Sequence, residues 1–116
     1  MTRTVFTGGR VFDGTGAAIS DADVAIEGGL IVDVGPGLDG DDGVDCSGKA
    51  LLPGLFDCHV HLAFRHEDFD EVRVMNEPFS LPFFRMAENL RTTLALGITT
   101  VRDASGADAG LRSAVE

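Results

Sequence analysis

Two histidines one residue apart, His59 and His61, are the residues of this sequence best suited to chemistry. In an extended strand, side chains alternate between faces, so Asp57, His59 and His61 are expected to share one face. Two imidazoles on one face can bind a single cation, with Zn–N distances of ~2.0–2.1 Å. The alternative is a histidine pair that lies in a loop or is hydrogen-bonded in a core. The apolar strand that Pro53 and Gly54 introduce favours the metal site.

The elements that follow the histidines alternate between helix and strand. Residues 82–96 predict a helix, because Pro82 suits a first turn and apolar residues recur at helical spacing. We expect this stripe to be an ordinary packing face; its members are Phe83, Ala87, Leu90 and Leu94. Gly97 ends the helix, β-branched residues predict a strand over 98–103, and residues 107–116 begin another helix. With the strand that carries the histidines, this order predicts a parallel βαβ unit.

The first half of the chain is rich in glycine, with 12 of the 15 glycines in residues 1–54. Between the glycines lie short β-type runs, at residues 4–7, 10–12, 23–26 and 30–34. Gly28 and Gly29 predict a tight hairpin turn between the last two runs, and residues 39–43 predict a polar, flexible tip. This half therefore predicts a small, strand-rich unit.

Charge and composition exclude several classes of partner. The chain of 116 residues carries a formal net charge of −10, which would repel nucleic acid and anionic membranes. No run approaches the ~20 apolar residues of a membrane span, and the N-terminus has no apolar signal segment. We therefore expect a cytoplasmic protein that binds no nucleic acid and no membrane. Cys46 and Cys58 are too few for a disulfide framework and are expected to be small buried thiols.

Three segments together resemble a known family. Residues 51–62, LLPGLFDCHVHL, closely resemble the first barrel strand of the amidohydrolase superfamily. Residues 97–103, GITTVRD, resemble the second strand of its imidazolonepropionase-like and Xaa-Pro-dipeptidase-like branch, and residues 8–14 resemble the start of its small β-sandwich. The resemblance implies an α/β fold. Residues 1–52 would form the N-terminal part of the β-sandwich, and residues 53–116 the first two βα units of an incomplete (β/α)8, TIM-like barrel.

The resemblance also implies a metal-dependent amidohydrolase. Such an enzyme hydrolyses amide or peptide-like C–N bonds of small molecules through a metal-activated water. His59 and His61 would be ligands of a divalent metal, Zn²⁺ first among them, with one or two ions per active site. Asp57 would be at most an outer-shell partner of these ligands or an ordinary buried polar residue. Asp103 would contact substrate, pair with Arg102 or cap the next helix.

The family's remaining site residues are a bridging lysine, two further histidines and an aspartate base, all expected after Glu116. A complete barrel takes ~250 residues, so we expect an N-terminal portion of a homo-oligomeric enzyme, inactive by itself. His66, next to the motif, is expected to be a mobile loop histidine. Two alternatives stay open: a non-enzymatic β-rich domain that binds a metal or a partner, and a half-site that an oligomer completes.

Overall fold

The computed structural model describes residues 2–64 and 76–116. The chain divides into two compact units, Met1–Pro53 and Gly54–Glu116. Each unit has its own secondary structure and is described by itself below. His66 lies outside the described residues, and so does the prediction made for it.

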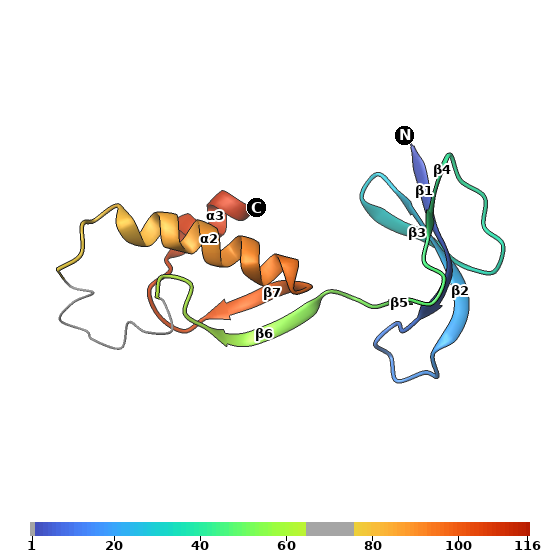
Figure 1. The fold of residues 1–116 in the computed structure, drawn as a ribbon, viewed down its shortest axis with the longest axis horizontal. Coiled ribbons are helices and arrows are strands. Elements are labelled where there is room, and N and C mark those ends of the chain that lie inside the picture. Colours follow the sequence, from blue (N-terminus) through green and yellow to red (C-terminus); the bar gives the residue numbers. More distant parts are fainter. Residues whose placement is uncertain (1, 65–75) are drawn as a thin grey trace. The chain divides into compact units, whose positions relative to one another are not determined.

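The first unit is a sheet of five strands (Figure 1). The strands are β1 (Arg3–Val11), β2 (Ser20–Glu27), β3 (Leu30–Gly35), β4 (Asp42–Asp45) and β5 (Ala50–Leu51). They lie in the order β3-β2-β1-β4, and β5 also pairs with β1. β2 is antiparallel to both of its neighbours, whereas β4 and β5 run parallel to β1.

The hairpin predicted at Gly28–Gly29 is confirmed, since the two residues join β2 to β3 with φ angles of 59° and 79°. A positive φ at both central positions is the type I′ geometry, which matches the twist of paired strands and which glycine adopts without strain. Val5, Val24 and Ala25 supply the buried apolar residues of this sheet. Local turn chemistry therefore fixes the register of β2 against β3.

The predicted flexible tip at residues 39–43 is wrong in part, because β4 begins at Asp42 inside it. β4 pairs in parallel with β1, from Thr4 opposite Asp42 to Thr7 opposite Asp45. Asp41 secures the approach to β4: its carboxylate accepts from the backbone N–H of Arg3 at 2.8 Å, and its own N–H donates to the Arg3 carbonyl at 2.8 Å. The partner strand is distant in sequence, so the local polar composition could not indicate this pairing.

The second unit alternates strand and helix, in the order β6 (Leu55–Val60), α2 (Leu81–Ala95), β7 (Ile98–Asp103) and α3 (Ala109–Val115). β6 and β7 are parallel neighbours, and α2 crosses between them along one side of the pair (Figure 1). The predicted helix and strand are confirmed to within one residue at each end. The chain contains both helices and strands and is thus α/β. Among the described residues of this unit, β6 and β7 form a sheet of two strands.

The ends of α2 and α3 follow their capping signals. Gly97 has a φ of 82°, and its N–H donates to the Leu94 carbonyl at 2.9 Å, which terminates α2 as predicted. The Asp108 carboxylate accepts from the N–H groups of Gly110 and Leu111, at 2.8 and 3.3 Å, and so begins α3. The two caps thus set where α2 ends and where α3 begins.

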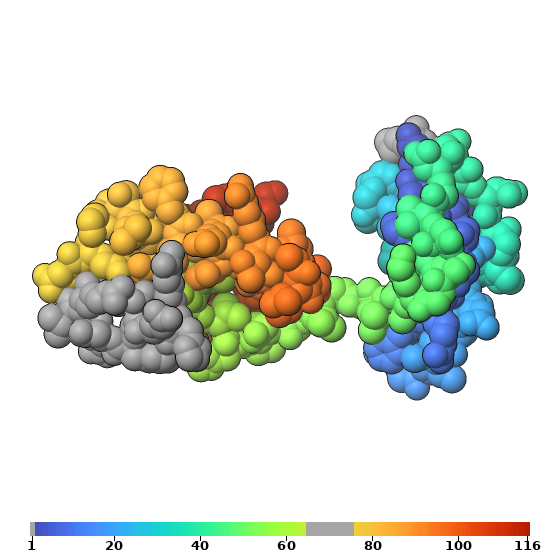
Figure 2. Space-filling view, viewed as in Figure 1, coloured from blue at the N-terminus to red at the C-terminus, as the bar shows by residue number. Residues whose placement is uncertain are grey.

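Of the stripe predicted on α2, Leu90 packs against the core of this unit, and the other members are exposed. Phe83 and Leu94 are 51% and 63% exposed, whereas Arg85 and Met86 are 5% exposed. Met86 joins Leu62 and Ala63 in the buried core of this unit. In Figure 2, α2 (yellow to orange) forms much of the visible surface of its unit. Arg85 and Met86 therefore share the packed side of the helix with the partly buried Leu90.

Gly54, just before β6, allows β6 and β7 to approach closely. A Cβ atom at this position would overlap the Thr99 side chain on β7. Gly54→Ala is therefore expected to lower the free energy of unfolding by about 1–3 kcal/mol, the usual cost of overpacking. Urea denaturation measures this cost. Adding Thr99→Gly should recover part of it as a coupling energy between the two sites. An alanine variant as stable as the original chain would contradict the close approach.

Candidate metal centre

The structure brings the two histidine rings together. His59 is the penultimate residue of β6, and His61 comes directly after the strand. Their ring centroids lie 5.1 Å apart, with the ring planes at 70° to each other. The His61 ring also makes an edge contact with Phe64, at a centroid distance of 6.0 Å. Both imidazoles therefore lie beside the end of one strand, close enough to approach a common ion.

β6 is not a regular strand where it carries His59. Its register against β7 shifts between Asp57, which pairs with Val101, and Val60, which pairs with Asp103. Within this irregular stretch the Asp57 carboxylate accepts a hydrogen bond from the backbone N–H of His59, at 3.0 Å. Asp57 thus holds the backbone that carries the first imidazole.

The carboxylate of Asp103 links the ends of both strands to the loops that follow them. One oxygen accepts from the N–H of Leu62 at 2.8 Å, and the other accepts from Ser105 at 2.8 Å and from Ala107 at 3.4 Å. Arg102 donates to the Cys58 carbonyl at 3.2 Å. The expectation that Asp103 caps the next helix is wrong, because Asp108 is the N-cap of α3. Asp103 instead holds the backbone before that helix, through Ser105 and Ala107.

Two side chains of α2, Asn89 and Arg85, contact the residues just after His61, and Glu77 holds Arg85. The Asn89 amide donates to the carbonyls of Leu62 and Phe64, at 2.8 and 3.0 Å. Arg85 donates to the Ala63 carbonyl at 3.1 Å and makes a bidentate ion pair with Glu77, at 2.9 and 3.0 Å. Sequence reasoning missed all three, since each is an ordinary polar residue by its local context.

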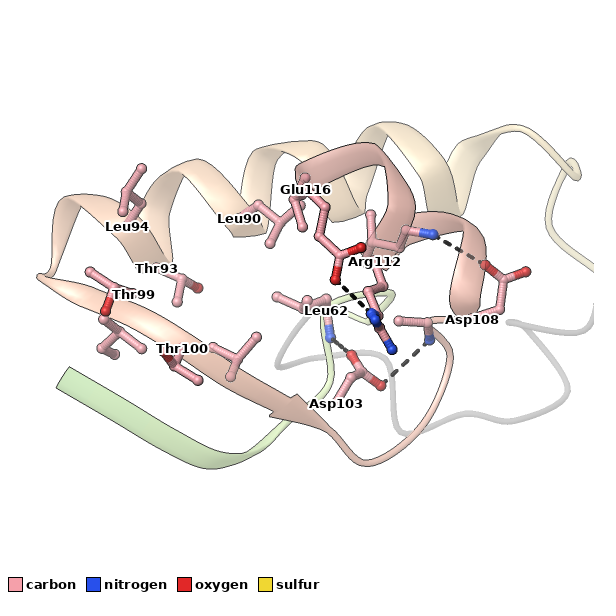
Figure 3. A pocket seen from close by; sticks show the side chains of 15 residues that line it. Leu62, Leu90, Thr93, Leu94, Thr99, Thr100, Asp103, Asp108, Arg112 and Glu116 are labelled. Atoms are coloured by element: carbon pink, nitrogen blue, oxygen red, sulfur yellow. Dashed lines mark hydrogen bonds and ion pairs between the residues drawn. The ribbon is translucent and has the colours of Figure 1, made fainter. Parts of the chain in front are cut away.

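A groove of about 760 Å³ lies between α2, β7 and α3. Figure 3 shows Leu62, Leu90 and Asp103 around it, with Asp103 bonded to the backbone on both sides. Neither His59 nor His61 lines this groove. The histidine pair and the groove are therefore separate features. Leu62, the residue directly after His61, lines the groove.

The donor chemistry fits a metal ion in part. Imidazole nitrogens are common zinc ligands, and the structure places two of them together. Within residues 2–64 and 76–116, no group of three or more His, Cys, Asp or Glu side chains could hold a metal ion. Catalytic zinc sites generally use three protein ligands, which is one more than the histidine pair contains.

The cysteines are both free, as expected, but the prediction that both are buried is wrong for one. Cys46 is buried in the first unit, whereas Cys58, beside His59, is exposed. Cys58 lies between Asp57 and Val60, where the register of β6 against β7 shifts.

The resolved pKa shifts fall in the first unit. Hydrogen bonds from the Thr15 backbone and hydroxyl lower the pKa of Asp13, and those from the Ser47 hydroxyl and backbone lower that of Asp45. These shifts belong to turn geometry rather than to the histidine pair.

No helix among the described residues is long and apolar enough to cross a membrane.

Comparisons with known proteins give partial matches. No family model matches the chain. A dihydroorotase from Trichlorobacter lovleyi is 45% identical over an alignment of 58 positions, which covers 47% of this chain and 14% of that protein. An imidazolonepropionase from Chloroflexus aggregans is 42% identical over an alignment of 62 positions, which covers 46% of this chain and 14% of that protein. The chain thus matches about one seventh of the length of these curated relatives.

Solved structures match nearly the whole chain. One match is the crystal structure of an uncharacterised protein, with 35% sequence identity and a TM-score of 0.83. The matched region covers 98% of this chain and 29% of the chain in that structure. A Xaa-Pro dipeptidase with bound methionine is 23% identical, covers 97% of this chain and 30% of its own, and has a TM-score of 0.77. At that identity the second match shows a shared fold.

Proposed function

We propose, since the chain belongs to the amidohydrolase superfamily, that it supplies two ligands to the metal centre of a hydrolase that cleaves C–N bonds. In this proposal residues 1–52 are part of a β-sandwich, and residues 53–116 are the first two βα units of a (β/α)8 barrel. The remaining ligands and the catalytic base would come from residues other than those described.

The observation that carries the proposal is the histidine pair at the end of a parallel strand. His59 and His61 lie 5.1 Å apart, centroid to centroid, at the carboxyl end of β6, and β7 runs parallel beside it. Barrel enzymes place their active sites at the carboxyl ends of their parallel strands. The pair therefore lies where an active site of that architecture would form.

Each residue near the pair then has a defined task. The imidazole nitrogens of His59 and His61 would bind the ion, and Asp57 would hold the His59 backbone through its hydrogen bond. A bound divalent cation lowers the pKa of a coordinated water toward ~7 and polarises a substrate carbonyl. Substrate contact by Asp103 would compete with three backbone N–H groups, so we assign this carboxylate to the loops.

The proposed substrate is a small molecule with an amide or dipeptide-like bond. The relatives named dihydroorotase and imidazolonepropionase support small molecules, and the fold shared with a Xaa-Pro dipeptidase is compatible with a peptide-like bond. The formal net charge of −10 disfavours polyanionic substrates.

A substrate screen tests this proposal on the full-length protein loaded with Zn²⁺. We expect hydrolysis within a panel of cyclic amides, N-acyl amino acids and Xaa-Pro dipeptides, and loss of that activity after chelation. Free Zn²⁺ at the same concentration gives the background rate. Activity confined to phosphate esters would refute the substrate class. A protein that binds no metal and hydrolyses nothing in the panel would favour the non-enzymatic alternative.

A further inference from the structure

The residues directly after the second histidine form a turn, residues 61–64, which we call the His61 turn. The N–H of Phe64 donates to the carbonyl of His61 at 3.2 Å and closes it. Leu62 and Ala63 are 4% and 5% exposed and belong to the core of the unit. The His61 ring thus projects from a buried turn and not from a free loop.

Side chains of two other elements bind the backbone of this turn at each of the three residues after His61. Asp103, at the end of β7, accepts from the N–H of Leu62. Asn89 of α2 donates to the carbonyls on either side of Ala63, those of Leu62 and Phe64. Both of its partners are carbonyl oxygens, so the amide must present its NH₂ group to them.

The third contact comes from a buried charge. Arg85 donates to the Ala63 carbonyl, and its guanidinium is held in place by both carboxylate oxygens of Glu77. The side chains of the pair are 5% and 9% exposed. A planar guanidinium held by two parallel hydrogen bonds has a fixed orientation, which a single contact would not impose. The arginine therefore presents a rigid donor to the turn.

We propose that Asn89, Arg85 and Asp103 are positioning residues that fix the orientation of the His61 imidazole relative to that of His59. The inference rests on the proposed function, because it assigns these residues to the same metal centre. Rotation of a peptide plane within the turn would swing the His61 ring. Metal sites require their ligands within about 0.5 Å of the productive geometry, so hydrogen bonds that stop this rotation preserve affinity.

The test is the affinity of the full-length protein for Zn²⁺, measured by competition with a chromophoric chelator, together with the visible spectrum of the Co²⁺ form. Asn89→Asp keeps the shape of the side chain but replaces the donor with an acceptor that repels both carbonyls. We expect its Kd for Zn²⁺ to rise about tenfold, the lower end of the ~10–100-fold range for outer-shell partners. The Co²⁺ spectrum should change as well.

Ala87→Gly is the matched control, because Ala87 is exposed on the same helix and glycine lowers helix stability without touching the turn. Its melting temperature should fall while its Kd for Zn²⁺ stays within about twofold of the original. Arg85→Lys keeps the charge but loses the bidentate geometry, so its Kd for Zn²⁺ should rise less than that of Asn89→Asp. It is the variant to measure if Asn89→Asp fails to fold.

The outcomes separate the inference from the proposed function. An unaltered protein that binds no Zn²⁺ would overturn the proposed function, and the inference with it. An unaltered protein that binds Zn²⁺, with folded variants at Asn89 and Arg85 that bind it equally well, would overturn the inference alone. A rise in Kd in both variants, with no rise in Ala87→Gly, would support it.

Discussion

Replacing His59 and His61 together by alanine is expected to remove most of the metal bound by the full-length protein. The two imidazoles lie 5.1 Å apart at the end of β6, and the double variant removes both of them. Metal affinity should fall by at least the ~10–100-fold that disturbed sites typically lose, and each single variant should bind less tightly than the original. Elemental analysis of the purified protein, expressed as metal per chain, measures the change.

The third histidine provides the control. His66 is close in sequence to the pair but is not assigned to the metal, so His66→Ala should retain the original stoichiometry. Unchanged metal content in the double variant would contradict the assignment of both ligands. Loss of metal in the His66 variant would show that the ligand set is larger than the pair.

The second large effect concerns the buried ion pair rather than the metal. Glu77→Ala leaves the Arg85 guanidinium, 5% exposed, without the carboxylate that it contacts at 2.9 and 3.0 Å. Removing one partner of a buried pair typically costs about 3–5 kcal/mol, because the remaining charge stays buried without that carboxylate. We expect a loss of that size in the free energy of unfolding of the second unit, measured by urea denaturation.

An exposed ion pair of the same unit makes a matched comparison. Arg112 and Glu116 approach to 2.7 Å but are 77% and 61% exposed, so Glu116→Ala should cost less than about 1 kcal/mol. The double variant Glu77→Met with Arg85→Met should recover much of the stability that Glu77→Ala loses, since no charge remains buried. Equal small losses at Glu77 and Glu116 would mean that the first pair is solvated in solution.

The elements of the second unit could be predicted because their signals are local. Pro82 lies in the first turn of the helix, Gly97 follows its end, and β-branched residues build the next strand. The hairpin at Gly28–Gly29 followed from its two glycines in the same way. Each of these signals lies within a few residues of the structure that it specifies.

The differences arose where distant residues decide the outcome. β4 forms because β1, far earlier in the chain, offers a parallel edge. The packed side of α2 includes Arg85, whose terminal guanidinium nitrogens pair with Glu77 and donate to the Ala63 carbonyl. Apolar periodicity treats an arginine as a solvent-exposed residue and therefore does not indicate that Arg85 is buried.

The candidate site divides in the same way. The histidine pair could be identified from residue type and a spacing of two, and the structure brings the rings together. The hydrogen bonds to the His61 turn could not, because Arg85, Asn89 and Asp103 act on it from 22 to 41 residues away. A polar residue in a helix carries no sign in the sequence that its partner is a distant backbone carbonyl.

Those sequence separations also set an order of events during protein synthesis. His59 and His61 leave the ribosome well before Asn89, and Asp103 follows the Leu62 that it binds by 41 residues. At ~5–20 residues per second, the nascent chain exposes both imidazoles for seconds before the side chains that orient the second one have been made. Metal captured in that interval would meet a flexible pair of histidines, so tight loading should follow the synthesis of Asp103.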